Sequence, residues 1–489
     1  MWRARDADPA AWDLLLHPRT LDLFTRTATL AVAVTAVGAV LAVPLAWLTV
    51  ASDLPGRRLW TVALCLPLAV PSYISGYVLL AAFGDGGLLD RWGWPRPEVY
   101  GFSGAVLALT ASTFPLMFLS CRAALASLDP SLVEAARALG RPPGLAFAAV
   151  SWPPLARALG SSGLVVAFYV LSDFGAVSLL QYDTFSRAIY MQLEGAFDRS
   201  LAALWSLALV APAFALLVLS AVAARRGPQA RAGRAATRRP RPVALGPWTA
   251  PALGGCLLIV AAAVGLPVAV IGWWAAQGAR GGALLDPALT SLTIAAVTAV
   301  VTVVGSLPLG YLAARSRSPA ARLLERVSYA AYALPPIVVA LSLVSFGIHV
   351  ASFAYGTLAM LVFAHVVRFG PLALGTSKGG FAALSPRLGE AAASLGRAPL
   401  AVATRVALPL LRAELAAGAA LVFLSVMKEL PATLLLGPIG LDTLPRRIWT
   451  AAGDGNFAAA ASPALVLIAL SSLGVALTLR HERAAEQAA

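Results

Sequence analysis

Charged side chains inside long apolar stretches are the residues of this chain best suited to chemistry. Asp173, Arg368 and the adjacent Lys428 and Glu429 all lie within such stretches. A charge at the centre of a bilayer costs about 2.5–3.5 kcal/mol on insertion scales, so charged residues retained there are functional candidates. Carboxylate oxygens are hard ligands that suit a hard cation. Asp173 and Glu429 are therefore predicted to line a translocation pathway.

The same two carboxylates also allow a structural interpretation. They could cap broken helices, or pair with Lys428 and Arg187 to hold the two halves of the chain together. Each follows a proline-containing loop by about 18 residues, which corresponds to about 27 Å along a helix. Both are therefore expected toward the outer side of the membrane.

The elements that position these residues are predicted to be transmembrane helices. The chain has 489 residues, of which 59% are hydrophobic and 12% are charged, against about 25% charged in a typical soluble domain. This composition excludes a soluble enzyme, a disordered chain and a fibrous repeat. The fold class is therefore all-α, a polytopic membrane protein with about 11–12 transmembrane helices. Apolar runs predict spans at 27–50, 60–83, 102–122, 155–180, 201–224, 248–275, 288–313, 327–350, 355–376, 410–436 and 461–480.

The distribution of basic residues predicts the orientation of these helices. Much of the net charge of +14 lies in the Arg-rich segment 225–247, which is typical of a cytoplasmic loop and does not indicate nucleic-acid binding. With that segment inside, the other inner loops are neutral or positive and the outer loops neutral or negative. An odd helix count places residues 1–26 outside. Residues 1–20 are polar and predict no cleavable signal peptide.

Cysteine and histidine patterns predict neither a disulfide framework nor a metal site. The three cysteines lie in apolar runs, and the four histidines, which include His365, lack ligand spacing.

An internal repeat divides the chain into two halves. Leu-Val-Glu-Ala-Ala-Arg-Ala-Leu-Gly-Arg at 132–141 recurs as Leu-Gly-Glu-Ala-Ala-Ala-Ser-Leu-Gly-Arg at 388–397, an offset of 256 residues. Asp-Thr-Phe at 183–185 likewise matches Asp-Thr-Leu at 442–444. Six predicted helices separate equivalent positions, so the repeat is parallel rather than inverted.

The repeat predicts two domains and a linker. They are residues 1–224 with five spans, the linker 225–247, and residues 248–489 with six spans. Helix 248–275 has no counterpart before residue 27. Either the first half lacks an opening helix, or the true start of the protein lies upstream.

Both copies of the Glu-Ala-Ala motif lie in predicted cytoplasmic loops, near 129–154 and 385–409. Asp129-Pro130 and Ser385-Pro386 are helix-start signals, and a glycine ends each short helix. Glu-Ala-Ala is also simply a good helix former. Its appearance twice in equivalent loops favours a helix that docks on a partner. The residues assigned to this docking are Glu134, Ala135, Ala136, Gly140, Glu390, Ala391, Ala392 and Gly396.

The repeated motif resembles the EAA loop of permease subunits in binding-protein-dependent ABC importers of type I. This resemblance implies two fused permease domains in the bacterial inner (plasma) membrane, with the loops acting as coupling helices. It also implies two copies of an ATP-hydrolysing subunit and an extracytoplasmic substrate-binding protein as partners. The chain has no Gly-x4-Gly-Lys-Ser/Thr phosphate loop. We therefore expect no enzyme activity and no cofactor in this chain, with ATP used by the partner.

Two segments narrow the range of substrates that this permease is expected to carry. Leu-Ser-Asp-Phe-Gly-Ala-Val-Ser at 171–178 and Lys-Glu-Leu-Pro-Ala-Thr-Leu-Leu-Leu-Gly-Pro at 428–438 are similar to ferric-iron importer permeases. That resemblance implies ferric iron, although eleven predicted helices depart from the family's usual twelve. Related permeases carry thiamine and other small solutes, and sulfate and molybdate permeases also carry a glutamate in the equivalent helix. A carboxylate therefore does not exclude an anion. An ion-driven secondary transporter is the alternative from another class.

Overall fold

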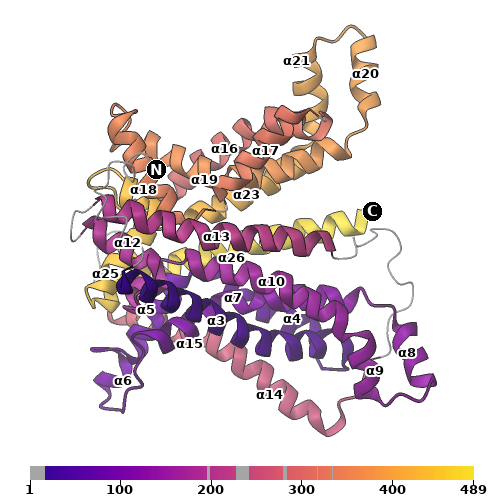
Figure 1. The fold of residues 1–489 in the computed structure, drawn as a ribbon, viewed down its shortest axis with the longest axis vertical. Helices are drawn as coiled ribbons and strands as arrows, with labels where there is room; N and C mark the ends of the chain where they lie inside the picture. The colour runs from indigo at the N-terminus through magenta and orange to yellow at the C-terminus, as the bar shows by residue number, and fades with distance from the viewer. Residues whose placement is uncertain are drawn as a thin grey trace. The chain divides into compact units, whose positions relative to one another are not determined.

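The computed structural model describes residues 17–194, 199–226, 242–278, 284–316, 318–332 and 334–488. Helices and connecting loops make up these segments, in which one isolated β-bridge joins Ser52 and Val243. The chain forms two compact units (Figure 1): residues 1–277 with 452–458, and residues 278–451 with 459–489. Residues 1–16 and most of the predicted Arg-rich linker, 227–241, lie outside the described residues.

Four long helices form the framework of the first unit: α3 (Pro18–Ala51), α7 (Phe102–Ala126), α10 (Trp152–Ser172) and α13 (Arg199–Arg226). Helix α7 packs against α3 and α10, and α10 packs against α13. A shorter helix, α5 (Ser72–Phe83), is buried along most of its length against α7 and α11 (Gly175–Leu179). Four threonines of α3 donate their hydroxyls to carbonyls one turn earlier, as in Thr27 Oγ1 to Leu23 O at 2.7 Å, which suits an apolar surrounding.

The first unit also contains the helix predicted to open the second domain. Helices α14 (Thr249–Val260) and α15 (Leu266–Gln277) are joined by a π-helical turn at Ala261–Gly265. Helix α14 packs against α4 (Arg57–Cys65), and α15 packs against α5. The domain boundaries 1–224, 225–247 and 248–489 describe the sequence repeat and stay a prediction, because compact units and repeats need not coincide.

The second unit has the same order of elements. Its framework is α16 (Leu285–Arg315), α19 (Leu358–Ala383) and α23 (Arg412–Met427), which pack against one another. Helix α17 (Pro319–Tyr332) packs against α19, and α18 (Pro336–His349) packs against α19 and α24 (Pro431–Leu436). Helices α25 (Leu444–Gly453) and α26 (Phe457–Ala488) complete the chain.

A pair of equivalent hydrogen bonds confirms the repeat at atomic level. In the first unit, the Phe185 N–H donates to Thr27 Oγ1 at 3.2 Å. In the second, the Leu444 N–H donates to Ser291 Oγ at 2.9 Å. Each bond ties the start of a short helix, α12 (Phe185–Glu194) or α25, to the first long helix of its own unit. The two halves therefore use the same local packing.

Several predicted spans are not single straight helices, which corrects the sequence interpretation. Span 60–83 is bent by 90° between residues 69 and 72, and span 327–350 by 108° between residues 332 and 336. Prolines at both breaks remove backbone donors and restrict the preceding residue. Spans 155–180 and 410–436 end early, at Ser172 and Met427, and continue as the short helices α11 and α24.

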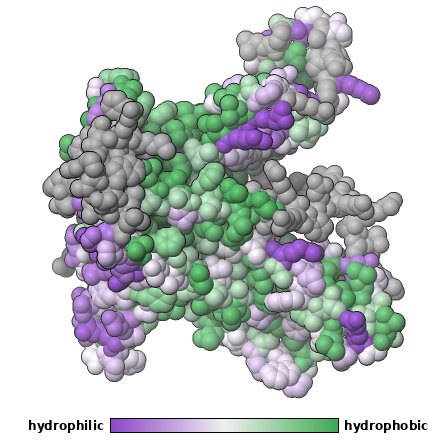
Figure 2. All heavy atoms as spheres, in the orientation of Figure 1, coloured by the Kyte–Doolittle hydropathy of each residue, from purple (hydrophilic) through white to green (hydrophobic). Residues whose placement is uncertain are grey.

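The described residues contain six helices long and apolar enough to cross a membrane, or up to nine if each bent pair is one span. Helices α13 and α26 contribute shorter apolar segments, 201–216 and 457–472, so the count of eleven stays a prediction. Figure 2 shows hydrophobic residues over much of the visible helix surface and hydrophilic residues gathered around α6 (Leu88–Arg91). This distribution is that of helices facing lipid.

Candidate translocation site and coupling loops

Asp173 lies at the break between α10 and α11. Its side chain is buried, and Oδ1 accepts hydrogen bonds from the backbone N–H groups of Ala176 at 3.0 Å and Val177 at 3.4 Å. The Ser72 hydroxyl, from the start of α5, donates to Oδ2. Backbone donors at a helix start offset the cost of burying a carboxylate. Asp173 therefore caps α11, as the structural interpretation of the sequence expected.

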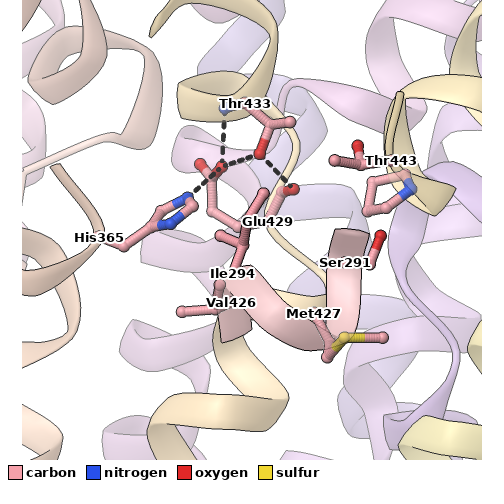
Figure 3. Close-up of a pocket in the computed structure, with 9 residues that line it drawn as sticks. Ser291, Ile294, His365, Val426, Met427, Glu429, Thr433 and Thr443 are labelled. Carbon is pink, nitrogen blue, oxygen red and sulfur yellow. Dashed lines mark hydrogen bonds and ion pairs between the residues drawn. The ribbon is translucent and has the colours of Figure 1, made fainter. Parts of the chain in front are cut away.

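Glu429 occupies the equivalent break between α23 and α24. Its oxygens accept hydrogen bonds from the Ala432 N–H at 3.0 and 3.1 Å. They also accept one from the Thr433 N–H at 3.2 Å (Figure 3). The residue is only 5% exposed. The two pseudo-equivalent carboxylates thus share one local role, because each starts a short helix after a membrane helix has ended.

Two cationic or protonatable side chains of α19 reach Glu429 in addition. His365 Nε2 lies 3.4 Å from Oε2, and Arg368 Nη1 lies 3.9 Å from Oε1. The sequence interpretation missed His365, whose spacing of three residues from Arg368 puts both on one helical face. Arg368 lies near the middle of α19, because this helix extends to Ala383, beyond the predicted span 355–376. Asp173, by contrast, has a hydroxyl partner.

Arg187 does not pair with either predicted carboxylate. It forms an ion pair with Asp183, four residues earlier, at the start of α12. This local ion pair engages the Arg187 guanidinium within its own turn, and it rules out one of the two pairings that the sequence suggested.

A small pocket adjoins Glu429, with room for about one water molecule (Figure 3). It is lined by Ser291, Ile294, His365, Val426, Met427, Glu429, Thr433, Thr443 and Pro445. Hydroxyl-bearing side chains from α16, from α24 and from the residue before α25 thus line the same pocket as Glu429. Hydroxyl and carboxylate oxygens together can replace part of the hydration shell of a hard cation.

The described part of the chain contains no cluster of three or more His, Cys, Asp or Glu side chains that could hold a metal ion.

The first predicted docking loop forms the expected short helix, α8 (Pro130–Ala138). The Asp129 carboxylate accepts the Ser131 N–H at 2.9 Å, and this hydrogen bond lowers the pKa of Asp129 below its usual value. Gly140 has a φ of +83°, and the Arg141 N–H donates to Ala136 O at 3.2 Å. These contacts form a Schellman-type end, which strongly favours glycine.

The second loop repeats this geometry in α20 (Pro386–Ser394). Gly396 has a φ of +74°, and the Arg397 N–H donates to Ala392 O at 3.2 Å. Ala391 is exposed here as Ala135 is in the first loop. Glu134 is exposed, whereas the side chain of Glu390 lies outside the described part of the structure.

Each loop also presents an exposed leucine that the sequence interpretation did not single out. Leu139 is 83% exposed and Leu395 is 81% exposed, each directly before the glycine with positive φ. Figure 1 shows α8 and α9 (Pro143–Val150) at the end of the first unit opposite α6, and α20 and α21 (Pro399–Val402) beyond the ends of α19 and α23. Matched exposed leucines on projecting helices are typical of a docking surface.

Comparisons with known proteins agree with these features. The family described as "Binding-protein-dependent transport system inner membrane component" matches residues 306–487. The "Fe(3+)-transport system permease protein FbpB 2" of Haemophilus influenzae is 34% identical over 487 residues, covering 96% of this chain and 92% of that protein.

Other relatives match only part of the chain. The "Molybdenum transport system permease protein ModB" of Escherichia coli is 33% identical over 25% of this chain and 60% of its own length. The "Probable sulfate transport system permease protein cysT" of Marchantia polymorpha is 27% identical over 35% of this chain and 61% of its own length. All three relatives are permease subunits, which transport and do not themselves catalyse a reaction.

Three observations lead to one assignment. A relative matches both halves of the chain, the two halves carry equivalent Glu-Ala-Ala helices, and the described residues form bundles of apolar helices. The chain belongs to the family of inner-membrane permease subunits of binding-protein-dependent ABC transport systems.

Proposed function

We propose that this permease carries ferric iron across the inner membrane. The observation that carries the proposal is the match to the ferric-iron permease of Haemophilus influenzae, which extends over 96% of this chain. The molybdenum and sulfate relatives match 25% and 35% of it. The lining of the pocket beside Glu429 includes hydroxyl oxygens and one carboxylate, which are ligand types that a hard cation prefers.

In the proposed transporter, ATP is hydrolysed by a separate ATPase subunit and not by this chain. A substrate-binding protein delivers iron from outside, and two copies of an ATPase subunit bind beneath the permease. Helices α8 and α20 act as the coupling elements. Their exposed leucines insert into apolar grooves of the ATPase, while Glu134 and Glu390 meet basic groups around those grooves. This chain binds no cofactor in the proposal.

The proposed pathway runs past the two helix breaks. At each break, backbone N–H groups that a continuous helix would bond to its own carbonyls are bonded to a carboxylate instead. The carboxylates of Asp173 and Glu429 stabilise these breaks, because each caps the start of the following short helix. Beside Glu429, the hydroxyls of Ser291 and Thr443 offer neutral oxygens to a cation that must bind weakly enough to leave again.

Uptake in cells that lack the chain tests the substrate. Radiolabelled ferric iron, molybdate, sulfate and thiamine are supplied separately, with the wild-type chain restored or left out. We expect at least a tenfold rise in iron uptake on restoration and no change for the other three solutes. A rise for molybdate or thiamine instead of iron would assign the permease to that solute.

A further inference from the structure

Two amphipathic helices, α4 and α17, occupy equivalent places in the two units. Each follows the first long helix of its unit, α3 or α16, and each leads through a sharp bend into the next helix, α5 or α18. Both contain an arginine followed by a leucine: Arg58-Leu59 recurs as Arg322-Leu323, 264 residues later. The prolines directly before α5 and α18, Pro71 and Pro335, have the same offset, so the two dipeptides are counterparts.

Both helices begin at the end of their unit from which the docking helices α8 and α20 project. In the second unit, Arg315 at the end of α16 donates to Leu384 O, directly after α19, at 2.6 Å, and α19 leads into α20. In the first unit, residues 180–182 bond to Arg26 of α3 and to Gly101 directly before α7, so these two helices start together. They also pack along each other, and α7 leads into α8. Both α4 and α17 therefore begin on the cytoplasmic side of the proposed transporter.

Helix α4 combines a basic start with an exposed apolar face. Leu59 is 71% exposed, and Val62 and Leu66 follow on the same face three and seven residues later and are also exposed. Leu64, on the face toward the bundle, is fully buried. The side chains of Arg57-Arg58 are exposed, and neither forms an ion pair with another described residue.

Helix α17 divides into two faces in the same way. On the face toward the bundle, Glu325 forms an ion pair with Lys378 of α19. On the other face, Leu323 is 62% exposed. Arg322 and Arg326, one turn apart, are exposed beside it and form no ion pair within the described part of the chain. The repeat has thus kept exposed arginines next to an exposed leucine in both units.

Exposed aromatic side chains accompany both helices. Trp248 is 71% exposed and ends the turn before α14, the helix that packs against α4. The segment before this turn is tied to the end of α3, because the Val243 N–H donates to Ala51 O at 2.8 Å. In α17, Tyr329 and Tyr332 are exposed. Tryptophan and tyrosine are enriched where a membrane protein meets the lipid headgroups, so α4 and α17 have the composition of helices at that level.

The position and charge of these helices favour a lipid over the ATPase as the occupant of their exposed faces. Figure 1 shows α8 beyond the ends of the long helices, whereas α4 lies alongside them. Exposed leucines at that level face acyl chains, and arginines beside them reach the phosphates of anionic headgroups. Asp53, the carboxylate nearest along the chain to the arginines of α4, is engaged by the Leu245 N–H at 2.9 Å.

We propose that α4 and α17 each bind an anionic phospholipid of the inner leaflet. The lipid phosphate lies against Arg57 and Arg58 in the first unit and against Arg322 and Arg326 in the second, while the acyl chains cover the exposed leucine of the same helix. The inference uses the orientation of the proposed transporter and does not depend on the solute that it carries.

Bound lipid at these sites stabilises the first arm of each bent helix pair. The second arms, α5 and α18, pack against α11 and α24, which are the short helices capped by Asp173 and Glu429. The two lipid sites are therefore connected through one helix each to the two helix breaks.

The test uses the full permease–ATPase complex purified in detergent. The probes are phosphatidylglycerol, which is anionic, and phosphatidylcholine with the same acyl chains, which is neutral. Native mass spectrometry counts the lipids and the ATPase subunits retained by each permease as lipid is titrated. The test variant, Arg58→Gln with Arg322→Gln, removes one guanidinium from each site. Arg157→Gln with Arg412→Gln is the matched control, since these exposed arginines lie near the starts of α10 and α23, outside both sites.

We expect the glutamine variant to raise the Kd for phosphatidylglycerol about fivefold, because each guanidinium near an anionic headgroup contributes a factor of that order. Phosphatidylcholine binding and the number of ATPase subunits should not change. The control variant should bind phosphatidylglycerol as the wild type does. Arg58→Lys with Arg322→Lys should keep most of the affinity, because the positive charges remain.

Four results would overturn the proposal. Wild-type affinity in the glutamine variant removes the sites, and an equal loss in the control variant replaces them with a general attraction to a positive surface. Loss of ATPase subunits with unchanged lipid binding assigns the arginines to the protein partner. Displacement of phosphatidylglycerol by inorganic phosphate assigns them to a soluble anion. None of these results alters the outcome of the uptake assay, which tests the proposed function separately.

Discussion

Glu429 shows how one side chain combines a structural and a chemical role. Three distances between its oxygens and the backbone nitrogens of Ala432 and Thr433 lie between 3.0 and 3.2 Å, which satisfies most of its acceptor capacity. His365 and Arg368 then offset its charge from the other side. Removing one partner of such a buried group costs more than the pair contributes, because the remaining charge is left uncompensated.

The Glu429→Gln variant separates these roles. The amide oxygen still accepts the backbone N–H groups, so α24 keeps its cap, whereas the ionic contact with Arg368 is lost. We expect ferric-iron uptake to fall at least tenfold at equal membrane abundance, with destabilisation of about 1–3 kcal/mol. Asp173→Asn is the control, because its partner Ser72 is neutral, and it should lower uptake less. Equal effects of both variants would contradict a special role for the Glu429 pocket.

At the scale of elements, the two docking helices depend on how they end. Gly140 and Gly396 adopt positive φ, where a Cβ atom costs about 1–2 kcal/mol whatever space surrounds it. Both glycines have open space around them, so a substitution acts on the backbone and not through a clash. The same turn therefore sets the direction of the exposed leucine before each glycine, Leu139 or Leu395.

A paired glycine substitution tests the docking helices. We expect Gly140→Ala combined with Gly396→Ala to reduce uptake several-fold while basal ATP hydrolysis by the complex persists, because strained turns misplace Leu139 and Leu395. Gly144→Ala is the matched control, since Gly144 lies in α9 without positive φ and also has open space around it. Uptake per ATP hydrolysed is the measurement. A double variant with wild-type coupling would contradict the docking role.

At the scale of the whole molecule, the repeated halves are alike in packing and unlike in chemistry. Each half has a carboxylate cap at a helix break and a short helix tied to its first long helix. His365 and Arg368 belong only to the second half, whereas the long loop between α5 and α7, residues 84–101, belongs only to the first. The two halves therefore share one arrangement of helices, and the residues that differ between them account for the proposed substrate specificity.

The energy source is a property of the whole assembly. We expect iron uptake by reconstituted vesicles to require ATP and the partner ATPase, and to continue when the proton gradient is abolished while ATP is maintained. Vesicles with an ATPase variant unable to hydrolyse ATP are the control. Uptake driven by an ion gradient without ATP would instead support a secondary transporter.

Local patterns in the sequence were enough to predict the features that depend on nearby residues. Apolar runs identify membrane helices because each needs about 20 apolar residues. The helix starts at Asp129 and Ser385 and the ends at Gly140 and Gly396 follow from capping and backbone rules that act within a few residues. The repeat is visible because duplication preserves order along the chain.

Tertiary structure alone decided which distant residues meet. His365 lies 64 residues before Glu429, and only the packing of α19 beside the α23–α24 break brings them within 3.4 Å. The bends of 90° and 108° depend on the neighbours that receive each half-helix. The grouping of α14 and α15 with the first unit likewise reflects packing against α4 and α5. Composition and periodicity describe one helix at a time, whereas helix rotation and choice of neighbour are set by contacts among all of them.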